Sequence, residues 1–584
     1  MQGFAFANVL PRFINRVNVL KRCACRLSGD GVRLDLRVPL KTYFGLADFR
    51  EGQEQVIEKL VSGKSAVAVF PTAGGKSLCY QLPAIMFDGL TVVVSPLLSL
   101  MRNQVDYLTG KQIPAVMVSS AQSPAEVDEI YEKLRKKEVK LLYCSPERFY
   151  DDRFLSALKK VQISMFAVDE AHCISEWGHS FRPLYTRVAT MAKMVGAERC
   201  LALTATATLP VISDIRNDFG IAAEDAVSLP FHRPNLQLKV SVIPGFLERL
   251  EYLYRAISER PRGSVIVYVM LQSTAEHVAQ FLQERGIDAE FYHAGMNGQA
   301  REILESRFQN DLHVIVATIA FGMGIDKADV RYVYHFNIAK SIEAYSQETG
   351  RAGRDGLPSI CETLFDQEDV QRAKELINTN LDANRELEHS LEEILDNGTA
   401  QPGKVLAMPN DYRLKVGQEL LAYAFKKEGF ADEQPPVYKV YSINVPSGTE
   451  ENLLDLSETT RRILQHSRKW RKNIKVERDV SLENGFTDVQ IIDGIQEIQE
   501  RSPFDVKPQG RIRRFLPKKC FTAKEATSST LTVMKNRNAQ DHERIDHLAR
   551  IFLSNECVPQ QIAAHFATEM EICGQCTACV DGIK

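Results

Sequence analysis

The sequence predicts an α/β protein in which residues 38–375 form two consecutive domains, each built on a parallel sheet. The main observation is a series of short apolar runs separated by segments with helical spacing, which is typical of parallel sheets covered on both faces. These runs are 66–70, 91–95, 140–144, 164–168 and 200–204, followed by 264–269, 289–292, 313–317, 331–335 and 360–365. Segment 231–234 is interpreted as the joint between the two domains.

The character of the chain changes after residue 375. Helical patterns at 459–470 and 489–500 precede a basic segment, 504–515, that has the pattern of a strand, a turn and a strand. Two helices followed by a basic hairpin are compatible with a winged helix. Residues 461–519 hold 15 Lys and Arg against 8 Asp and Glu. We expect Arg511, Arg513, Arg514, Lys518 and Lys519 to contact phosphates, unless this side is simply a solvated face.

Composition excludes several classes of protein. No run of eighteen apolar residues occurs, so we expect no membrane span. The 12 cysteines are mostly scattered through apolar patterns, which indicates reduced core residues in an intracellular protein rather than a disulfide framework. The arginine-rich segment 1–37 overlaps in composition with organelle transit peptides or is a mis-assigned start, so we exclude it from fold reasoning.

A glycine-rich loop follows the first apolar run. It contains Thr72, Gly74, Gly75, Lys76 and Ser77, and a helical pattern begins directly after it. Backbone N–H groups at such a helix start bind phosphate, Lys76 reaches the β- and γ-phosphates, and the Ser77 hydroxyl is a ligand for Mg²⁺. The alternative is a tight strand-to-helix turn without a ligand.

The apolar run 164–168 leads into Asp169, Glu170, Ala171 and His172. Carboxylates at the C-terminal edge of a parallel sheet lie where such sheets bind ligands. We expect Asp169 to hold the metal, Glu170 to orient and deprotonate the attacking water, and His172 to sense the nucleotide state. The alternative is a solvated acidic strand end.

Residues 347–356 place Arg351 and Arg354 in a loop with three glycines. Guanidinium groups stay charged and bind phosphate oxygens two at a time. By itself the loop indicates phosphate chemistry and no specific reaction.

In this order and spacing, the segments resemble the RecQ family of superfamily 2 helicases over residues 40–370. The resemblance identifies motif I at 72–77, motif II at 169–172, motif III at 204–206, motif V at 317–327 and motif VI at 347–356. It also covers the aromatic-rich loop 177–183. The chain departs from the family pattern at Ala73 and at Ser180.

The resemblance implies two RecA-like domains with ATP and Mg²⁺ bound between them. Gln53 would read adenine in a pocket shaped by Phe49 and Arg50, and Asp326 and Gln347 would also contact the nucleotide. Arg351 and Arg354 would reach the γ-phosphate from the second domain, with Arg354 as the arginine finger. The residues implied in DNA binding or coupling are His172, Trp177, His179, Phe181, Arg182, Thr204 and Thr206.

The implied activity is ATP-dependent unwinding of DNA, 3′ to 5′, on single strands and duplex junctions during recombination, repair or replication. The protein would act in the cytoplasm at the nucleoid or in the nucleus, and an organelle remains open. Two alternatives stay open: an ATP-switched DNA remodeller without processive unwinding, and an RNA-directed helicase.

Four cysteines near the end of the chain form a separate pattern: Cys557, Cys573, Cys576 and Cys579. Four thiolates suit tetrahedral Zn²⁺, with an iron–sulfur cluster or free thiols as alternatives. RecQ helicases carry a similar zinc module directly after the second RecA-like domain, whereas here a long region intervenes. The predicted regions are 1–37 (extension), 38–228 and 229–375 (RecA-like), 376–540 (linker and winged-helix-like), and 541–584 (zinc-binding module).

Overall fold

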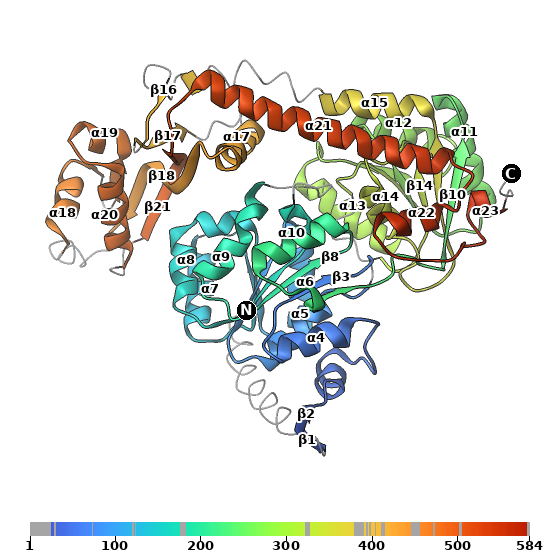
Figure 1. Ribbon diagram of the computed structural model, residues 1–584, viewed down its shortest axis with the longest axis horizontal. Helices are drawn as coiled ribbons and strands as arrows, with labels where there is room; N and C mark the ends of the chain where they lie inside the picture. The colour runs from blue at the N-terminus through green and yellow to red at the C-terminus, as the bar shows by residue number, and fades with distance from the viewer. Residues whose placement is uncertain are drawn as a thin grey trace. The chain divides into compact units, whose positions relative to one another are not determined.

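The computed structural model describes most of the chain and divides it into two structural units. The described residues are 25–28, 31–72, 74–119, 122, 124–175, 183–321, 327–378, 391–392, 395, 399–402, 404–409, 415–445, 456–470, 473–500 and 505–580. The first unit comprises Met1–Asn378 and Ala539–Lys584, and the second unit comprises Thr379–Asn538 (Figure 1). Among the described residues, we find no helix whose length and apolar content would let it cross a membrane.

The first parallel-sheet domain has seven strands in the order β5-β6-β4-β7-β8-β3-β9. Its strands are β3 (Ala66–Val69), β4 (Leu90–Val94), β5 (Ala115–Val118), β6 (Leu141–Cys144), β7 (Ile163–Val168), β8 (Cys200–Thr204) and β9 (Ala226–Ser228). All neighbouring strands are parallel, as predicted. The two edge strands, β5 and β9, were not predicted from the sequence.

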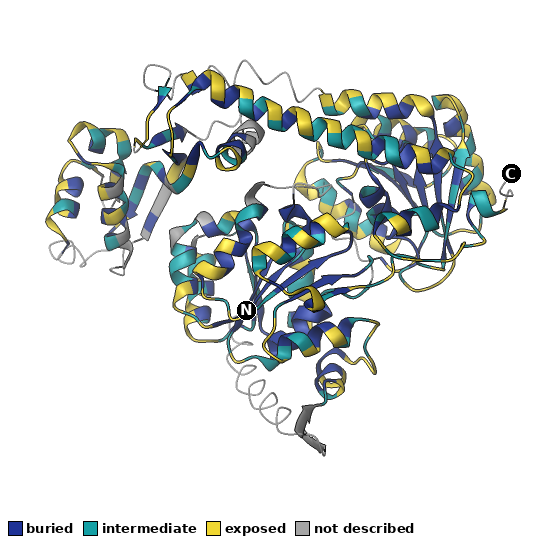
Figure 2. Ribbon diagram, in the orientation of Figure 1, coloured by how far each residue is buried: buried dark blue, intermediate teal, exposed yellow. Residues whose placement is uncertain are grey.

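Helices cover both faces of this sheet. They are α4 (Gln53–Val61), α5 (Leu78–Met86), α6 (Leu98–Gly110), α7 (Pro124–Arg135), α8 (Asp152–Lys159), α9 (Val188–Met194) and α10 (Leu209–Phe219). Alternate residues of β3 enter different cores: Ala66 and Ala68 pack in the core with α4, α5 and α6, and Val67 and Val69 in the core with the other four helices. The strands are buried on both sides (Figure 2), which explains their continuous apolar pattern.

The second parallel-sheet domain has six strands in the order β10-β15-β14-β11-β13-β12. They are β10 (Leu236–Val242), β11 (Ser264–Tyr268), β12 (Ala289–Tyr292), β13 (Val314–Ala317), β14 (Val330–His335) and β15 (Ser359–Phe365). Its helices are α11 (Phe246–Glu259), α12 (Gln272–Gln283), α13 (Gly298–Asn310), α14 (Ile342–Thr349) and α15 (Gln367–Asn378). All strand pairs are parallel, so the prediction of two parallel sheets is confirmed.

Short elements complete this unit. The strands β1 (Cys25–Ser28) and β2 (Gly31–Leu34) form an antiparallel pair inside the predicted extension 1–37. The short helices are α3 (Arg37–Pro39), η1 (Leu40–Phe44), η2 (Pro146–Tyr150), η3 (Ala171–Ile174), η4 (Pro183–Arg187) and η5 (Ala223–Asp225).

The cysteine-rich end of the chain packs on the second parallel-sheet domain. It contains the C-terminal part of α21 (Ala523–Leu553), from residue 539 on, together with α22 (Val558–His565) and α23 (Thr577–Val580). Phe552 and Ile562 belong to the same apolar core as the sheet residues Ile266 and Ile315. The end of α21 runs beside α15 (Figure 1), where Lys374 Nζ lies 2.6 Å from an Asp546 carboxylate oxygen. The second unit is therefore an insertion between α15 and the cysteine-rich segment.

The second unit contains a five-stranded antiparallel sheet in the order β17-β21-β18-β20-β19, and a two-stranded pair, β16-β22. The strands are β16 (Thr399–Ala400), β17 (Leu406–Pro409), β18 (Ala431–Asn444), β19 (Arg468–Trp470), β20 (Asn473–Glu477), β21 (Asp505–Pro517) and β22 (Phe521–Thr522). The helices are α17 (Lys415–Lys427), α18 (Glu458–Gln465), α19 (Arg478–Glu483) and α20 (Asp488–Glu500). Helices α18 and α20 share a core with β18, β20 and β21, and β18 precedes all of these elements in the chain.

Two local predictions in this unit are wrong. Segment 504–515 is no hairpin, because its described part lies in the single long strand β21 and pairs with β18. Gly510 has φ +69° inside that strand, with paired residues on both sides. The predicted helix 459–470 ends at Gln465, and Arg468–Trp470 instead pairs with β20 as β19.

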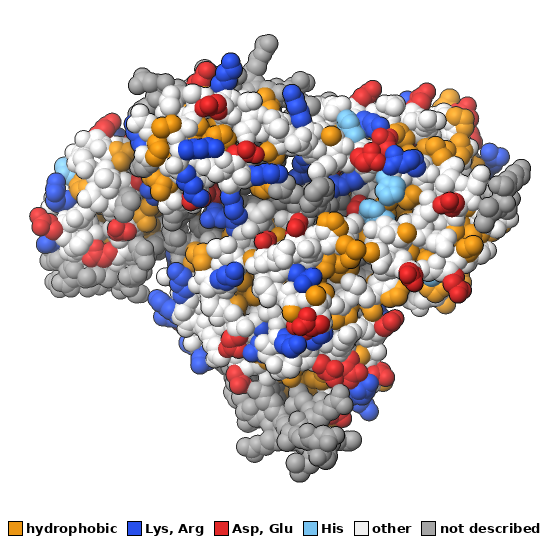
Figure 3. Space-filling view, in the orientation of Figure 1, with side chains coloured by type: hydrophobic (Ala, Val, Ile, Leu, Met, Phe, Trp, Pro, Cys, Tyr) orange, Lys and Arg blue, Asp and Glu red, His pale blue; other side chains and the backbone are white. Residues whose placement is uncertain are grey.

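The prediction that Arg513 and Arg514 contact phosphates is also wrong. Both side chains are buried, 3% and 5% exposed. Arg513 Nε donates to Glu433 at 2.9 Å, and Arg514 Nε lies 3.7 Å from Asp488. Lys518 is exposed and pairs with Asp432 at 2.9 Å. On the face drawn in Figure 3, Lys and Arg side chains lie among Asp and Glu side chains.

Candidate nucleotide-binding site

The phosphate loop connects β3 to α5 and surrounds Lys76. Lys76 Nζ donates to the Phe70 carbonyl at 3.2 Å. Burial lowers the pKa of Lys76, the charges of Glu170 and Asp169 oppose that change, and the charge of Arg354 adds to it. The lysine therefore lies among the acidic pair of motif II and an arginine of motif VI, which come from different domains. This is the spatial relationship that the sequence motifs predict.

Gln53 connects the segment before α4 to the phosphate loop through hydrogen bonds. Its buried amide accepts from the Arg50 N–H at 2.8 Å and donates to the Gly75 carbonyl at 2.9 Å. Gly75 has φ +72°, and a side chain at this position would begin 2.4 Å from Gln53 Nε2. Only glycine fits here. Phe49 is half-buried with the Arg37 guanidinium 6.0 Å from its ring centre, and the Arg50 side chain is exposed.

Asp169 and Glu170 follow the C-terminal end of β7. Burial raises the pKa of Asp169 to about 7, with a further contribution from Glu170, while Lys76 lowers it. Glu170 has φ +50°, a left-handed conformation that costs a non-glycine residue about 1–3 kcal/mol. The Glu170 N–H donates to Asp169 Oδ1 at 3.0 Å. The backbone thus holds two carboxylates side by side next to a cation.

A line of polar contacts leads from this carboxylate pair to the second domain. His172 Nδ1 lies 3.4 Å from Glu170 Oε2 and 2.9 Å from the Thr204 hydroxyl. Thr204 Oγ1 accepts from the Thr206 N–H at 3.2 Å, and Gln347 Nε2 donates to the Thr206 hydroxyl at 3.4 Å. Motifs II, III and VI are therefore in sequential contact.

The loop with the two arginines begins at the end of α14. Ser341 caps the start of this helix, and its hydroxyl accepts from the Ala344 N–H at 3.1 Å. At Gly350, an added Cβ would lie 2.7 Å from Thr72 Cβ, so this backbone touches the phosphate loop. Arg351 is buried and hydrogen-bonds Tyr268, whose pKa burial raises to about 12. Arg354 is half-buried.

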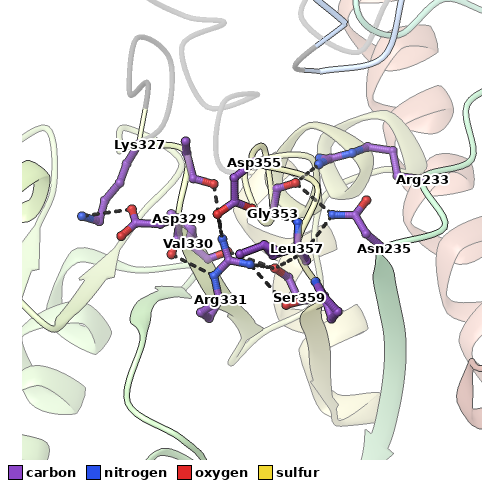
Figure 4. Close-up of polar contacts among 12 residues, drawn as sticks. Arg233, Asn235, Lys327, Asp329, Val330, Arg331, Gly353, Asp355, Leu357 and Ser359 are labelled. Atoms are coloured by element: carbon purple, nitrogen blue, oxygen red, sulfur yellow. Dashed lines mark hydrogen bonds and ion pairs between the residues drawn. The ribbon is translucent and has the colours of Figure 1, made fainter.

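Three residues that hold this loop were not predicted from the sequence. Arg233 donates to the Gly350 carbonyl at 2.9 Å and to the Gly353 carbonyl at 2.5 Å. Asn235 also donates to Gly353, at 2.9 Å. Arg331 hydrogen-bonds Asp355 and thereby lowers the pKa of that carboxyl group (Figure 4). The available signal was a charged residue in the joint 231–234, which we interpreted only as a boundary.

Several predicted site residues lie outside the described residues. These are Trp177, His179, Phe181 and Arg182 in the aromatic-rich loop, and Asp326 in motif V. Their roles stay predictions. Ala73 and Ser180, where the chain departs from the family pattern, also lie outside the described residues.

The four predicted metal ligands meet at one point, apart from the phosphate loop in the sequence. The sulfur atoms of Cys557, Cys573, Cys576 and Cys579 all lie within 4.8 Å of one another. Tetrahedral Zn²⁺ with Zn–S bonds of about 2.3 Å would separate its sulfurs by roughly 3.8 Å. The 3.4 Å separation of Cys576 from Cys579 and the 3.9 Å separation of Cys573 from Cys579 are near that value.

Backbone N–H groups favour the thiolate form of one member of this cluster, Cys573. The N–H groups of Gln575 and Cys576 donate to Cys573 Sγ at 3.5 and 3.3 Å. Burial raises the pKa of Cys573, but these hydrogen bonds outweigh burial and leave the pKa below its usual value. Burial raises the pKa of Cys576 to about 12. Four converging sulfurs with such donors fit a soft divalent metal.

Comparisons with known proteins match the same regions. The DEAD/DEAH box helicase family matches residues 50–215. The helicase conserved C-terminal domain matches residues 248–356. Among solved structures, that of Mycobacterium smegmatis helicase Lhr bound to ssDNA and AMP-PNP has a TM-score of 0.47 and 18% identity, over 63% of this chain and 53% of that chain.

Relatives with higher identity have been described from bacteria. The ATP-dependent DNA helicase RecQ of Pasteurella multocida is 41% identical over 331 residues, which cover 56% of this chain and 52% of that protein. The probable ATP-dependent DNA helicase RecS of Bacillus subtilis is 40% identical over 345 residues, which cover 59% of this chain and 69% of that protein. The chain thus spans little more than half of the Pasteurella protein's length and over two thirds of the Bacillus protein's.

Proposed function

Because the chain belongs to the RecQ family of superfamily 2 helicases, we propose that it is an ATP-dependent DNA helicase that moves 3′ to 5′ along one strand. The observation that supports this most strongly is the split arrangement around Lys76. Its pKa responds to Glu170 and Asp169 of its own domain and to Arg354 of the second domain. Such an arrangement makes hydrolysis depend on how the two domains meet.

In this proposal, ATP binds between the two RecA-like domains. The N–H groups of the phosphate loop and Lys76 bind its phosphates, and Gln53 reads adenine. Ser77 and Asp169 would hold Mg²⁺, which neutralises phosphate charge when bound. Glu170 accepts the proton of the attacking water. Its left-handed backbone presents the carboxylate beside Asp169.

Coupling to DNA would use the contacts that join motifs II, III and VI. A change at Glu170 is transmitted through His172, Thr204 and Thr206 to Gln347 on α14. Arg354 follows the same helix. Closure of the two domains would therefore bring the Arg354 guanidinium to the γ-phosphate and complete the site. An arginine finger contributes about 10³–10⁵ in rate.

We propose DNA with a single-stranded 3′ tail next to a duplex as the substrate. Trp177 and Phe181 in the aromatic-rich loop would stack on bases or transmit their binding. The protein would work where DNA is, in a cytoplasm with a nucleoid or in a nucleus.

At the four-cysteine cluster we propose a structural Zn²⁺ ion. The four thiolates would hold it, and its chemistry is to crosslink residues 557 and 573–579. The sulfur separations and the N–H donors to Cys573 support the proposal.

One experiment tests the proposed activity. Wild-type protein and Lys76→Ala are compared for DNA-stimulated ATP hydrolysis and for displacement of a strand from 3′-tailed, 5′-tailed and blunt duplexes. We expect wild type to displace only the 3′-tailed strand and Lys76→Ala to do neither reaction. Lys64→Ala, which changes an exposed lysine paired with Asp225, serves as the control. Hydrolysis without displacement would favour a remodeller, and stimulation by RNA alone would favour an RNA helicase.

A further inference from the structure

We infer that the cysteine-rich end of the chain positions the loop that carries Arg351 and Arg354, which we call the arginine loop. His565 is the residue through which it does so. This inference rests on the proposed function, because it concerns how the same ATP site is assembled. The residue that receives the contact is Glu343 in the first turn of α14. That helix carries Gln347 and ends at Thr349, two residues before Arg351.

The polar contact is short and shielded from water. His565 Nε2 lies 2.8 Å from Glu343 Oε1. The side chains are 18% and 7% exposed. His565 is the last residue of α22, and α22 begins after the predicted metal ligand Cys557. The segment that follows the predicted metal ligand Cys557 therefore reaches α14 through a helix of about two turns.

Two aromatic contacts reinforce this connection. Phe566 stacks on Phe231, with ring centres 4.6 Å apart and planes inclined by 27°. Phe231 stands two residues before Arg233, which binds the carbonyls of Gly350 and Gly353. Phe552 meets the edge of Tyr345 on α14 at 5.1 Å. The C-terminal segment thus packs both against Phe231, close to the loop anchor Arg233, and against Tyr345 on the helix that leads into the arginine loop.

A small cavity shows how near the three parts lie. Its lining includes Thr72 from the phosphate loop, Gly350 from the arginine loop, and Pro559 and Ile562 from α22. Because these residues line the same cavity, a displacement of α22 would directly affect the neighbouring ATP site. Displacement of reacting groups by about 1 Å can reduce a rate about 10²-fold.

The same segment also contacts the domain elsewhere, which supplies a control. Gln237 Nε2 donates to the Gln575 carbonyl at 3.0 Å, and the Val240 N–H donates to the Thr577 hydroxyl at 2.8 Å. Both contacts lie on β10, an edge strand of the sheet. Gln237→Ala therefore removes a contact between the segment and the domain while leaving His565 and Glu343 in place.

The test measures kcat and KM for DNA-stimulated ATP hydrolysis by the full chain. We expect His565→Leu and Glu343→Leu each to lower kcat about tenfold with KM unchanged, because binding is kept and the arginine loop is misplaced. The double variant should be no worse than either single variant, since both remove one interaction. His565→Gln, which keeps a donor, should recover most of kcat, and Gln237→Ala should behave as wild type.

Two readouts separate positioning from general damage. Metal content by elemental analysis should match wild type in His565→Leu and Glu343→Leu, and both variants should stay folded at the assay temperature. If kcat falls only together with metal content or with loss of the folded state, or if kcat does not change, the inference is wrong. Failure of the proposed function is seen separately, as wild-type protein without DNA-stimulated hydrolysis.

Discussion

The imidazole of His172 and the hydroxyl of Thr204 share a buried hydrogen bond of 2.9 Å. Thr204 Oγ1 lies 3.1 Å from the Thr206 carbonyl oxygen, to which it donates, so its single hydrogen is used there and it accepts from His172. His172 then carries its hydrogen on Nδ1. The carboxylate pair after β7 is thereby connected to the residue that Gln347 contacts.

Thr204→Val should separate hydrolysis from strand displacement. The two side chains have similar shape, but valine leaves the His172 donor and the Thr206 N–H without this acceptor, at a cost of about 1–3 kcal/mol. We expect ATP binding to persist and displacement per ATP hydrolysed to fall. Parallel ATPase and displacement assays measure that ratio. Thr42→Val, on an exposed side chain, is the control; an equal fall in both reactions would contradict the coupling role.

Arg354→Ala should reduce hydrolysis far more than ATP affinity. An arginine finger stabilises charge that develops in the transition state, so its loss should lower kcat by about 10³–10⁵. Single-turnover hydrolysis and direct ATP-binding measurements separate the two effects. The matched control is Arg102→Ala, because Arg102 pairs with Glu302 of the second domain in an exposed ion pair. Such a pair contributes about 0–1 kcal/mol. Equal losses in binding and hydrolysis would argue against a finger.

Arg233→Lys should impair hydrolysis although the charge is retained. The guanidinium donates to Gly350 and Gly353 at once, and a lysine cannot reproduce that fork. We expect lower kcat with little change in KM, measured by steady-state ATPase assays. Arg372→Lys, at an exposed pair with Glu368, should leave both unchanged. A wild-type kcat in Arg233→Lys would show that the loop holds its shape without this anchor.

Removal of the metal should destabilise the second parallel-sheet domain as well as the cysteine segment. Cys557 and Cys576 belong to the same apolar core as the sheet, so loss of the crosslink should loosen shared packing. We expect chelator treatment to lower the melting temperature and to release about one zinc per chain. Cys573→Ser should also lower the melting temperature, and it should be purified with less zinc. Elemental analysis and thermal melting check this. Cys520→Ser, at an exposed cysteine outside the cluster, is the control. Iron instead of zinc in the elemental analysis would show that the four cysteines hold an iron–sulfur cluster.

Local patterns were sufficient to predict the two parallel sheets and the convergence of the four cysteines. β7 and its carboxylates were predictable because six consecutive buried residues end at Asp169. Arg233 was not, since its partners are backbone carbonyls more than a hundred residues away, which leave no trace in composition. The insertion of the second unit also needed the structure, because the packing of Phe552 and Ile562 on the sheet is a long-range event.

Arg513 shows that a positively charged segment of sequence does not by itself predict which basic side chains are exposed to bind phosphate. We expected it to contact phosphate, but the side chain is 3% exposed and donates to Glu433. Removing one partner of a buried ion pair costs about 3–5 kcal/mol. Arg513→Ala should therefore lower the melting temperature of the second unit.

Lys518→Ala provides the opposite case, because Lys518 is 56% exposed beside Asp432. If the segment contacts DNA, this variant should keep the melting temperature and reduce the salt dependence of DNA binding by about one unit of slope. Thermal melting and DNA binding at several salt concentrations distinguish the two variants. An unchanged melting temperature in Arg513→Ala, with weaker DNA binding, would restore the original expectation that Arg513 contacts phosphate.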